Sequence, residues 1–133
     1  MGETLSIDLG AIYTAWANYL KGHSDAKHFS MLGDGNIAKF PHANLRLLGN
    51  PTNSSDLDND ECTWNVTFQT TCYISTPNDT KVLSLYGMDN ACRDFFVGLG
   101  FRKMGESIPM VNTQVASITS RYNMTHYNGS LDL

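Results

Sequence analysis

The sequence predicts an α+β fold: a two-layer sandwich with helices packed on one face of a mostly antiparallel sheet. Residues Cys62–Ile74 alternate between apolar and polar side chains, which is typical of a strand with one buried and one solvated face. Leu5–Leu20 and Thr80–Val97 carry apolar residues at three- and four-residue spacing, which is typical of amphipathic helices. With two short strands and a long final one, these elements form two layers around a single core.

The size and composition of the chain predict one domain over residues 1–133. Hydrophobic residues make up 41% and charged residues 17%, as in ordinary globular proteins. No apolar run approaches the ~20 residues that cross a bilayer, so no contact with a membrane is expected. The net charge is −4 and the nine Lys and Arg are scattered along the chain, so tight binding to DNA phosphates is not expected.

The first helix is predicted over Leu5–Leu20 from a single apolar stripe. Thr4 or Ser6 is positioned to cap its start, and Gly22 stands where a glycine often follows a helix.

Two connecting segments flank one short strand. Gly22–Lys39 has few apolar residues and is predicted to be a loop with room for one short strand. Ala43–Leu48 is predicted to be a strand. Gly49–Asp60 is rich in Pro, Asn, Ser and Asp and is predicted to be a surface loop.

The long strand is predicted to end at Ser75, and its two faces differ in chemistry. The apolar face holds Trp64, Val66, Phe68, Cys72 and Ile74, interrupted only by Thr70, and the other face holds Thr63, Asn65, Thr67, Gln69, Thr71 and Tyr73. A face of hydroxyl and amide side chains suits contact with other proteins and shows no catalytic grouping. We expect the apolar face to pack on both helices, with Trp64 and Phe68 against Met88, Cys92 and Phe96.

The second half of the chain is predicted as one helix and two strands. Asp79 or Thr80 is positioned to cap the helix Thr80–Val97, and glycines follow it. A strand is expected over Phe101–Met104, then a loop over Glu106–Asn112 held by its proline. The final strand is predicted over Val115–Tyr127, with Ile118, Ser120, Tyr122 and Met124 on one side and Thr119, Arg121, Asn123 and Thr125 on the other.

Motifs of enzymes and of metal sites are missing from the sequence. Asp56–Glu61 begins like a calcium-binding loop, but Glu61 and Thr67 stand where an EF-hand requires Gly and Glu. The four histidines are scattered without metal-ligand spacing. No nucleotide-binding loop, nucleophile elbow or zinc-protease motif occurs. We therefore predict no catalytic residues, no metal and no cofactor.

The three cysteines are predicted to be free thiols. Cys62 and Cys72 lie ten positions apart on one strand, or roughly 33 Å at ~3.3 Å per residue, which is too far for a disulfide. Cys72 and Cys92 are expected to face the core. The start of the chain shows no signal-peptide pattern, which favours a reducing compartment. Five Asn-x-Ser/Thr sequons begin at Asn53, Asn65, Asn78, Asn123 and Asn128, so a glycosylated secreted module remains an alternative.

Several short stretches between about residues 40 and 125 carry a resemblance to a known family. They are Phe40-Pro41, Leu47-Leu48-Gly49-Asn50-Pro51, Asp56-Leu57 with Glu61, Val66-Thr67-Phe68-Gln69, the stretch Asp89–Phe96, Leu99-Gly100-Phe101-Arg102-Lys103, Pro109-Met110, Asn112 and Ser120-Arg121-Tyr122. In these stretches the chain resembles the tail terminator or tail-completion proteins of long-tailed bacteriophages, also called minor capsid or head–tail joining proteins.

The resemblance implies a structural part of the virion. Such proteins form a homohexameric ring that caps the tail tube, ends its polymerisation and joins the tail to the head connector, while DNA passes through the lumen without specific binding. The partners implied are other copies of the chain, the tube protein and the connector proteins. The location implied is the tail or neck of the virion, assembled in the bacterial host cytoplasm.

A ring contact uses two different patches of each subunit, and we expect the polar faces of the two long strands and the acidic loop beside them to supply much of it. The candidate interface residues are Asp56, Asp58, Glu61, Thr67, Gln69, Arg121, Asn123 and Tyr127. A different neck or tail component, such as a head–tail adaptor or a tube subunit, remains an alternative.

Overall fold

A computed structural model describes residues 9–31, 39–48, 63–75, 78–112 and 114–127, with side chains except at 63–65 and 125–127. These residues form two helices and six strands. In chain order they are α1 (Leu9–His23), β1 (His28–Ser30), β2 (His42–Leu48), β3 (Thr63–Ser75), α2 (Asp79–Gly98), β4 (Arg102–Lys103), β5 (Ile108–Val111) and β6 (Val115–Tyr127).

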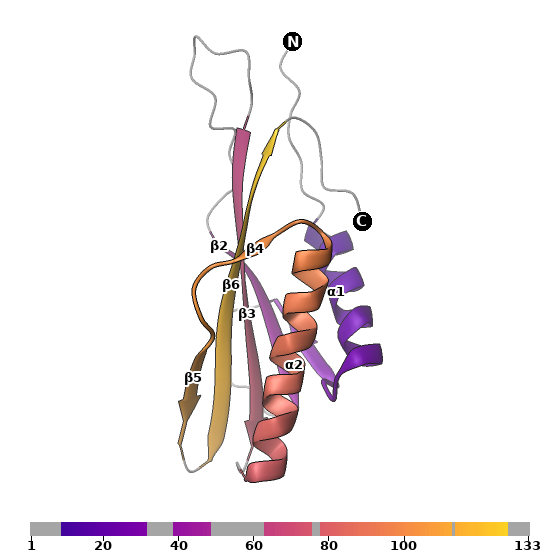
Figure 1. Cartoon of the computed structure of the whole chain (residues 1–133). Coiled ribbons are helices and arrows are strands. Elements are labelled where there is room, and N and C mark those ends of the chain that lie inside the picture. Colours follow the sequence, from indigo (N-terminus) through magenta and orange to yellow (C-terminus); the bar gives the residue numbers. More distant parts are fainter. Residues whose placement is uncertain (1–8, 32–38, 49–62, 76–77, 113, 128–133) are drawn as a thin grey trace.

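The strands form one sheet in the order β1-β2-β3-β6-β4, with β5 also paired to β6. Every pairing is antiparallel except that of β1 with β2. Both helices lie on the same side of the sheet (Figure 1). The predicted α+β sandwich of two layers is therefore confirmed.

The two long strands β3 and β6 pair along their whole length, from Thr63 opposite Tyr127 to Ser75 opposite Val115. Side chains opposite each other in such a pair point to the same face. The predicted alternation is observed on the helix side of β3, where Val66, Phe68, Thr70, Cys72 and Ile74 are buried. The same side of β6 buries Ala116, Ile118, Ser120 and Tyr122.

The centre of the core is a group of aromatic rings. Phe68 of β3 stacks on Phe96 of α2 with ring centroids 5.3 Å apart, and Phe96 stacks on Tyr122 of β6 at 5.0 Å. Phe101 meets Phe96 edge-on at 5.2 Å. The expected packing of Phe68 on Phe96 is confirmed, whereas the side chain of Trp64 lies outside the described part.

Helix α1 extends further than the sequence indicated. It ends at His23 rather than Leu20, so Gly22 lies inside it. The reason is Ser24, which donates its backbone N–H at 2.9 Å and its hydroxyl at 2.7 Å to the carbonyl of Leu20. These bonds satisfy the end of the helix without a glycine. The predicted caps Thr4 and Ser6 lie outside the described residues.

The N-cap of α2 is Asn78, not Asp79 or Thr80. Its side-chain oxygen accepts a hydrogen bond from the backbone N–H of Lys81 at 2.9 Å, which is the usual role of an N-cap amide. Asp79 occupies the first turn, where its charge favours the helix dipole. At the other end, Gly100 adopts a φ of 99°, a conformation that glycine adopts with little strain.

The predicted loop over Glu106–Asn112 is wrong for Ile108–Val111, which form β5. The sequence predicts that Pro109 holds a loop here, and proline cannot donate a hydrogen bond to a strand ladder. It is tolerated here because β5 pairs on one side only, with β6, and proline occurs on edge strands. The short strand β1 lies in the segment expected to have room for one.

Candidate functional site

The surface of the sheet opposite the helices is left uncovered by the described elements (Figure 1). We call this surface the outer face. Among its members are Arg46 of β2, Thr67, Gln69, Thr71 and Tyr73 of β3, Arg102 of β4 and Thr119, Arg121 and Asn123 of β6. Polar side chains dominate it, as expected from the alternation of β3 and β6.

Two pairs of cross-strand neighbours at the centre of the outer face are joined by hydrogen bonds. Arg121 donates from Nε to Oε1 of Gln69 at 3.0 Å. Asn123 donates from Nδ2 to Oγ1 of Thr67 at 2.8 Å and to the carbonyl of Val66 at 3.3 Å. These bonds hold the four polar side chains in fixed positions on an open surface.

The structure therefore brings together four of the eight predicted interface residues: Thr67, Gln69, Arg121 and Asn123. Tyr127 lies at the far end of β6 opposite Thr63, and its side chain is not among those described. The acidic residues Asp56, Asp58 and Glu61 lie outside the described residues, so the structure does not place them.

A concentration of arginines on the outer face was not expected from the scattered basic residues of the sequence. Arg46, Gln69 and Arg121 lie in one row across β2, β3 and β6. Arg102 of β4 pairs with Asn123 in a neighbouring row. All three arginines are exposed, and we call them the arginine band. The sequence held one signal for this arrangement. Arg46 stands between two leucines of a strand, so its side chain is expected on the face opposite the core.

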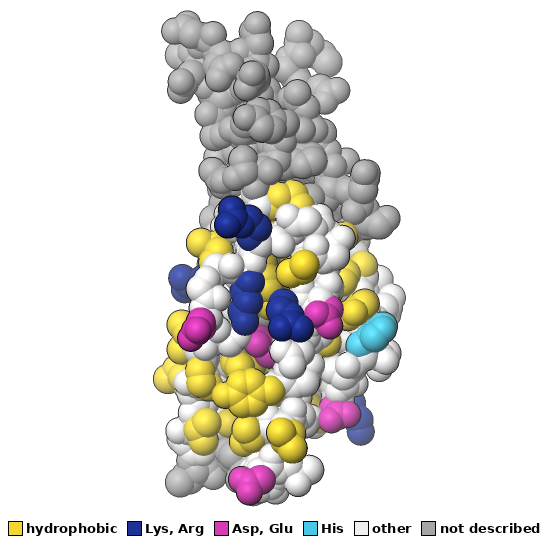
Figure 2. Space-filling view, viewed as in Figure 1, with side chains coloured by type: hydrophobic (Ala, Val, Ile, Leu, Met, Phe, Trp, Pro, Cys, Tyr) yellow, Lys and Arg dark blue, Asp and Glu magenta, His cyan; other side chains and the backbone are white. Residues whose placement is uncertain are grey.

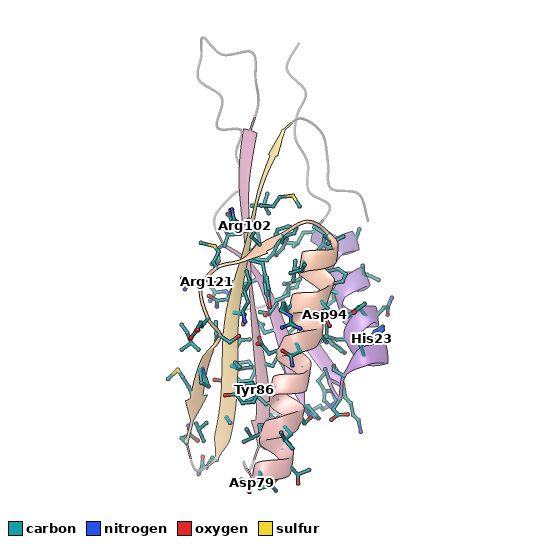
Figure 3. All side chains as sticks on the ribbon, in the orientation of Figure 1. His23, Asp79, Tyr86, Asp94, Arg102 and Arg121 are labelled. Atoms are coloured by element: carbon teal, nitrogen blue, oxygen red, sulfur yellow. The ribbon has the colours of Figure 1, made fainter. Side chains whose placement is uncertain are left out.

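The acidic and basic residues are unevenly distributed, because none of the six strands contains an Asp or Glu. In Figure 3, Arg102 and Arg121 are labelled on the strands and Asp94 on α2. Within the described part of the chain, the only ion pair joins Arg93 to Asp94 at 3.3 Å on that helix. The arginine band thus faces no carboxylate that the structure describes.

A second polar group lies on the helix side of the sheet, and sequence reasoning missed it. Asp89 of α2, which is 3% exposed, accepts hydrogen bonds from the hydroxyls of Ser107 at 2.6 Å and Ser120 at 2.7 Å. Lys103 donates from Nζ to the hydroxyl of Ser107 at 2.7 Å. The group joins α2, β4, β6 and the segment that precedes β5.

The arrangement of this group is typical of a structural anchor. Both serine hydroxyls are directed at a carboxylate, and Lys103 reaches the carboxylate only through Ser107. Neither observed hollow is lined by any of these four residues. One hollow of about 630 Å³ lies between the end of α1 and the first half of α2, with Asp25, Lys27 and Lys81 in its wall.

Cys72 and Cys92 are buried free thiols in the core, at the positions expected for them. Trp16 of α1 donates from Nε1 to the sulfur of Cys92 at 3.3 Å. The hydrogen bond with Cys92, together with burial, raises the pKa of the Cys72 thiol well above its usual range. That thiol therefore stays protonated and weakly reactive.

The helix side also carries an exposed apolar area. Figure 2 shows apolar side chains gathered around the position of Tyr86, which Figure 3 labels on α2. Tyr86 is 43% exposed, and Leu83 of the same helix and Val111 of β5 are more exposed still. Exposed apolar areas of this kind are typical of surfaces that contact other proteins.

Two further observations concern membranes and metals. In the part of the chain that the structure describes, no helix is long and apolar enough to cross a membrane. Over the same residues, no group of three or more His, Cys, Asp or Glu side chains gathers as a metal site would require.

Comparisons with protein families and with curated proteins found no match to this chain.

Proposed function

We propose that this protein is a structural assembly subunit, a tail terminator of a long-tailed bacteriophage. In this role, copies of the chain form a ring that caps the tail tube, ends its polymerisation and joins the tail to the head connector. The observation that carries the proposal is the outer face, a long polar sheet surface that no described element covers. The resemblance of residues 40–125 supplies the identity of the assembly.

The dimensions of the outer face support a role in subunit contact. Strands β3 and β6 each contain 13 residues, so they extend over about 40 Å. A domain of this length has a diameter near ~35 Å. The two strands therefore cross the whole domain, and their outer face is long enough to support a contact between subunits.

The ordered polar side chains on this surface support the same role. Thr67, Gln69, Arg121 and Asn123 are held by cross-strand hydrogen bonds. Side chains already fixed in place lose less conformational entropy when a partner binds. The contact is expected to be weak in a free subunit and to close into a ring when the tail tube serves as a template.

The buried polar group does not favour an enzyme as the function. Its carboxylate is 3% exposed, and both of its hydroxyls are bonded to that carboxylate. A nucleophile needs a base within reach and access to substrate. The group holds the segment before β5 in place, which suits a structural protein.

One sequon is engaged in the fold through the atom that a glycan would occupy, which disfavours the alternative of a glycosylated secreted module. The Nδ2 atom of Asn123, where a glycan would be attached, donates to Thr67 and Val66. The proposal of a structural subunit in a virion is consistent with this amide remaining unmodified.

The test is electron microscopy of the purified protein with tail tubes of the virus that encodes it. We expect a single ring at one end of each tube and no further growth at that end. Subunits stacked as a continuous helical tube would instead indicate a tube subunit. A ring that binds connectors without tubes would indicate a head–tail adaptor.

A further inference from the structure

The arginine band has an arrangement that suits a charged partner. Arg46 and Arg121 lie in one row, two strands apart, which is about 10 Å at ~4.8 Å between neighbouring strands. Arg102 extends the band onto β4. Gln69 lies between the first two and accepts a hydrogen bond from Arg121. The guanidinium groups thus keep most of their donors for a partner.

The partner that these groups favour is a set of carboxylates. Guanidinium groups bind carboxylates with two parallel hydrogen bonds, and the strands supply no Asp or Glu to neutralise them. The chain as a whole carries 13 acidic residues against nine basic ones. A second copy of the chain is therefore a source of negative charge.

The densest acidic segment of the chain is residues 56–61, where four of six positions are acidic: Asp56, Asp58, Asp60 and Glu61. We propose that the arginine band binds the acidic segment 56–61 of a second copy of this chain. The inference rests on the proposed function, since it names the contact between neighbouring subunits of the ring. A band on one subunit and a segment on the next are the two different patches that a closed ring requires.

The test exchanges charges between two variants. The band variant carries Arg46→Glu and Arg121→Glu, and the segment variant carries Lys in place of all four acids of residues 56–61 (Asp56→Lys, Asp58→Lys, Asp60→Lys and Glu61→Lys). Alone, each variant sets like charge against like charge. In an equimolar mixture, the band of each variant meets a segment of opposite charge on the other. Association is measured by sedimentation at high protein concentration and low ionic strength, and each variant is checked by thermal melting.

We expect the wild type to associate, each variant alone to associate at least about tenfold more weakly, and the mixture to recover. Added salt should weaken the wild-type association, because exposed charges are screened. Where charge reversal lowers the melting temperature, Arg46→Gln with Arg121→Gln serves as the milder band variant and should weaken association with its fold intact. The matched control is Arg93→Glu on α2, which should associate like the wild type.

Each other outcome overturns the inference. A band variant that associates normally removes the arginine band from the contact, and a mixture that fails to recover places the charge pairing elsewhere or within one chain. A wild type that stays monomeric at every concentration shows that the charged contact does not join free subunits. None of these prevents a ring from forming on tail tubes, so the proposed function is judged separately.

Discussion

Tyr122 places a hydroxyl group in the core where no described group forms a hydrogen bond with it. Burial is the main cause that raises the pKa of Tyr122 far above its usual range, and the nearby Cys92 and Asp89 add to it. The nearby hydroxyl of Ser120 lowers this pKa, although it does not form a hydrogen bond with the phenol. The folded protein therefore keeps this phenol neutral. The hydroxyl of Thr70, which is also fully buried, likewise has no hydrogen-bond partner among the described groups.

The substitution Tyr122→Phe is expected to leave the free energy of unfolding at neutral pH unchanged or to raise it by about 1 kcal/mol, since an unpaired buried polar group costs ~1–3 kcal/mol. The ring itself is retained, so its stacking on Phe96 persists. Chemical denaturation at pH 7 measures the difference. A loss of more than 1 kcal/mol would mean that the hydroxyl has a partner.

The same variant changes the dependence of stability on pH. In the unfolded chain a tyrosine ionises near pH ~10, whereas the folded state raises the pKa of Tyr122. The stability that this group contributes is therefore fully present below pH ~10 and is lost as the pH rises further. Above pH 10 the free energy of unfolding of Tyr122→Phe should fall less steeply than that of the wild type. Parallel curves would contradict the raised pKa.

At the scale of elements, Asp89 joins α2 to the segment that leads into β5. Its two carboxylate oxygens accept from Ser107 and Ser120, and Lys103 bonds to Ser107. An edge strand with four exposed residues buries little apolar surface of its own. This polar group is therefore expected to contribute much of what fixes the path of the chain before β5.

The substitution Asp89→Asn keeps the shape of the side chain and removes its charge. We expect it to lower the free energy of unfolding by about 1.5–3 kcal/mol, which is typical of lost hydrogen bonds to a charged group. Asp94→Asn on the same helix is the matched control, because Asp94 is exposed and pairs with the neighbouring Arg93. Its effect should stay within about 0.5 kcal/mol. Equal effects in urea denaturation would contradict the anchoring role of Asp89.

The long amphipathic elements were predictable from sequence because their patterns report burial directly. The alternation of β3 and the spacing in α2 predicted which side chains face the core, including Phe68 and Phe96. Elements whose fit depends on tertiary context were not predictable. Pro109 is compatible with a loop and with an edge strand alike, and only the pairing of β5 with β6 decides between them.

The candidate site was predictable in part, for the same reason. The register of β3 with β6 brings Gln69 to Arg121 and Thr67 to Asn123, as the polar alternation of the two strands indicated. The sequence did not predict that Arg46 and Arg102 lie on the same face as these residues, because residues 46, 102 and 121 come from three separate strands. The group around Asp89 was missed because its hydroxyls come from two segments more than ten residues apart.

At the scale of the whole molecule, the sheet has two faces of different chemistry. Its helix side carries the aromatic core, whereas its outer face carries polar side chains that the described elements leave uncovered. Phe68 and Gln69 are neighbours in β3 that point to these two different faces. They form a matched pair for testing whether the stability of the fold and the proposed subunit contact are independent.

We expect Phe68→Ala to lower the free energy of unfolding by about 3–5 kcal/mol, because it removes a fully buried ring and leaves a cavity. Gln69→Ala should cost about 1 kcal/mol or less, since it removes one hydrogen bond to an exposed arginine. Thermal and urea denaturation measure both effects.

In electron microscopy with tail tubes, we expect the two substitutions to rank the opposite way in their effect on capping. Gln69→Ala should reduce the number of capped tubes, whereas Phe68→Ala that remains folded at low temperature should still cap them. Normal capping by Gln69→Ala would remove this residue from the subunit contact, and equal losses of stability would show that the two faces of β3 are not divided as the register indicates.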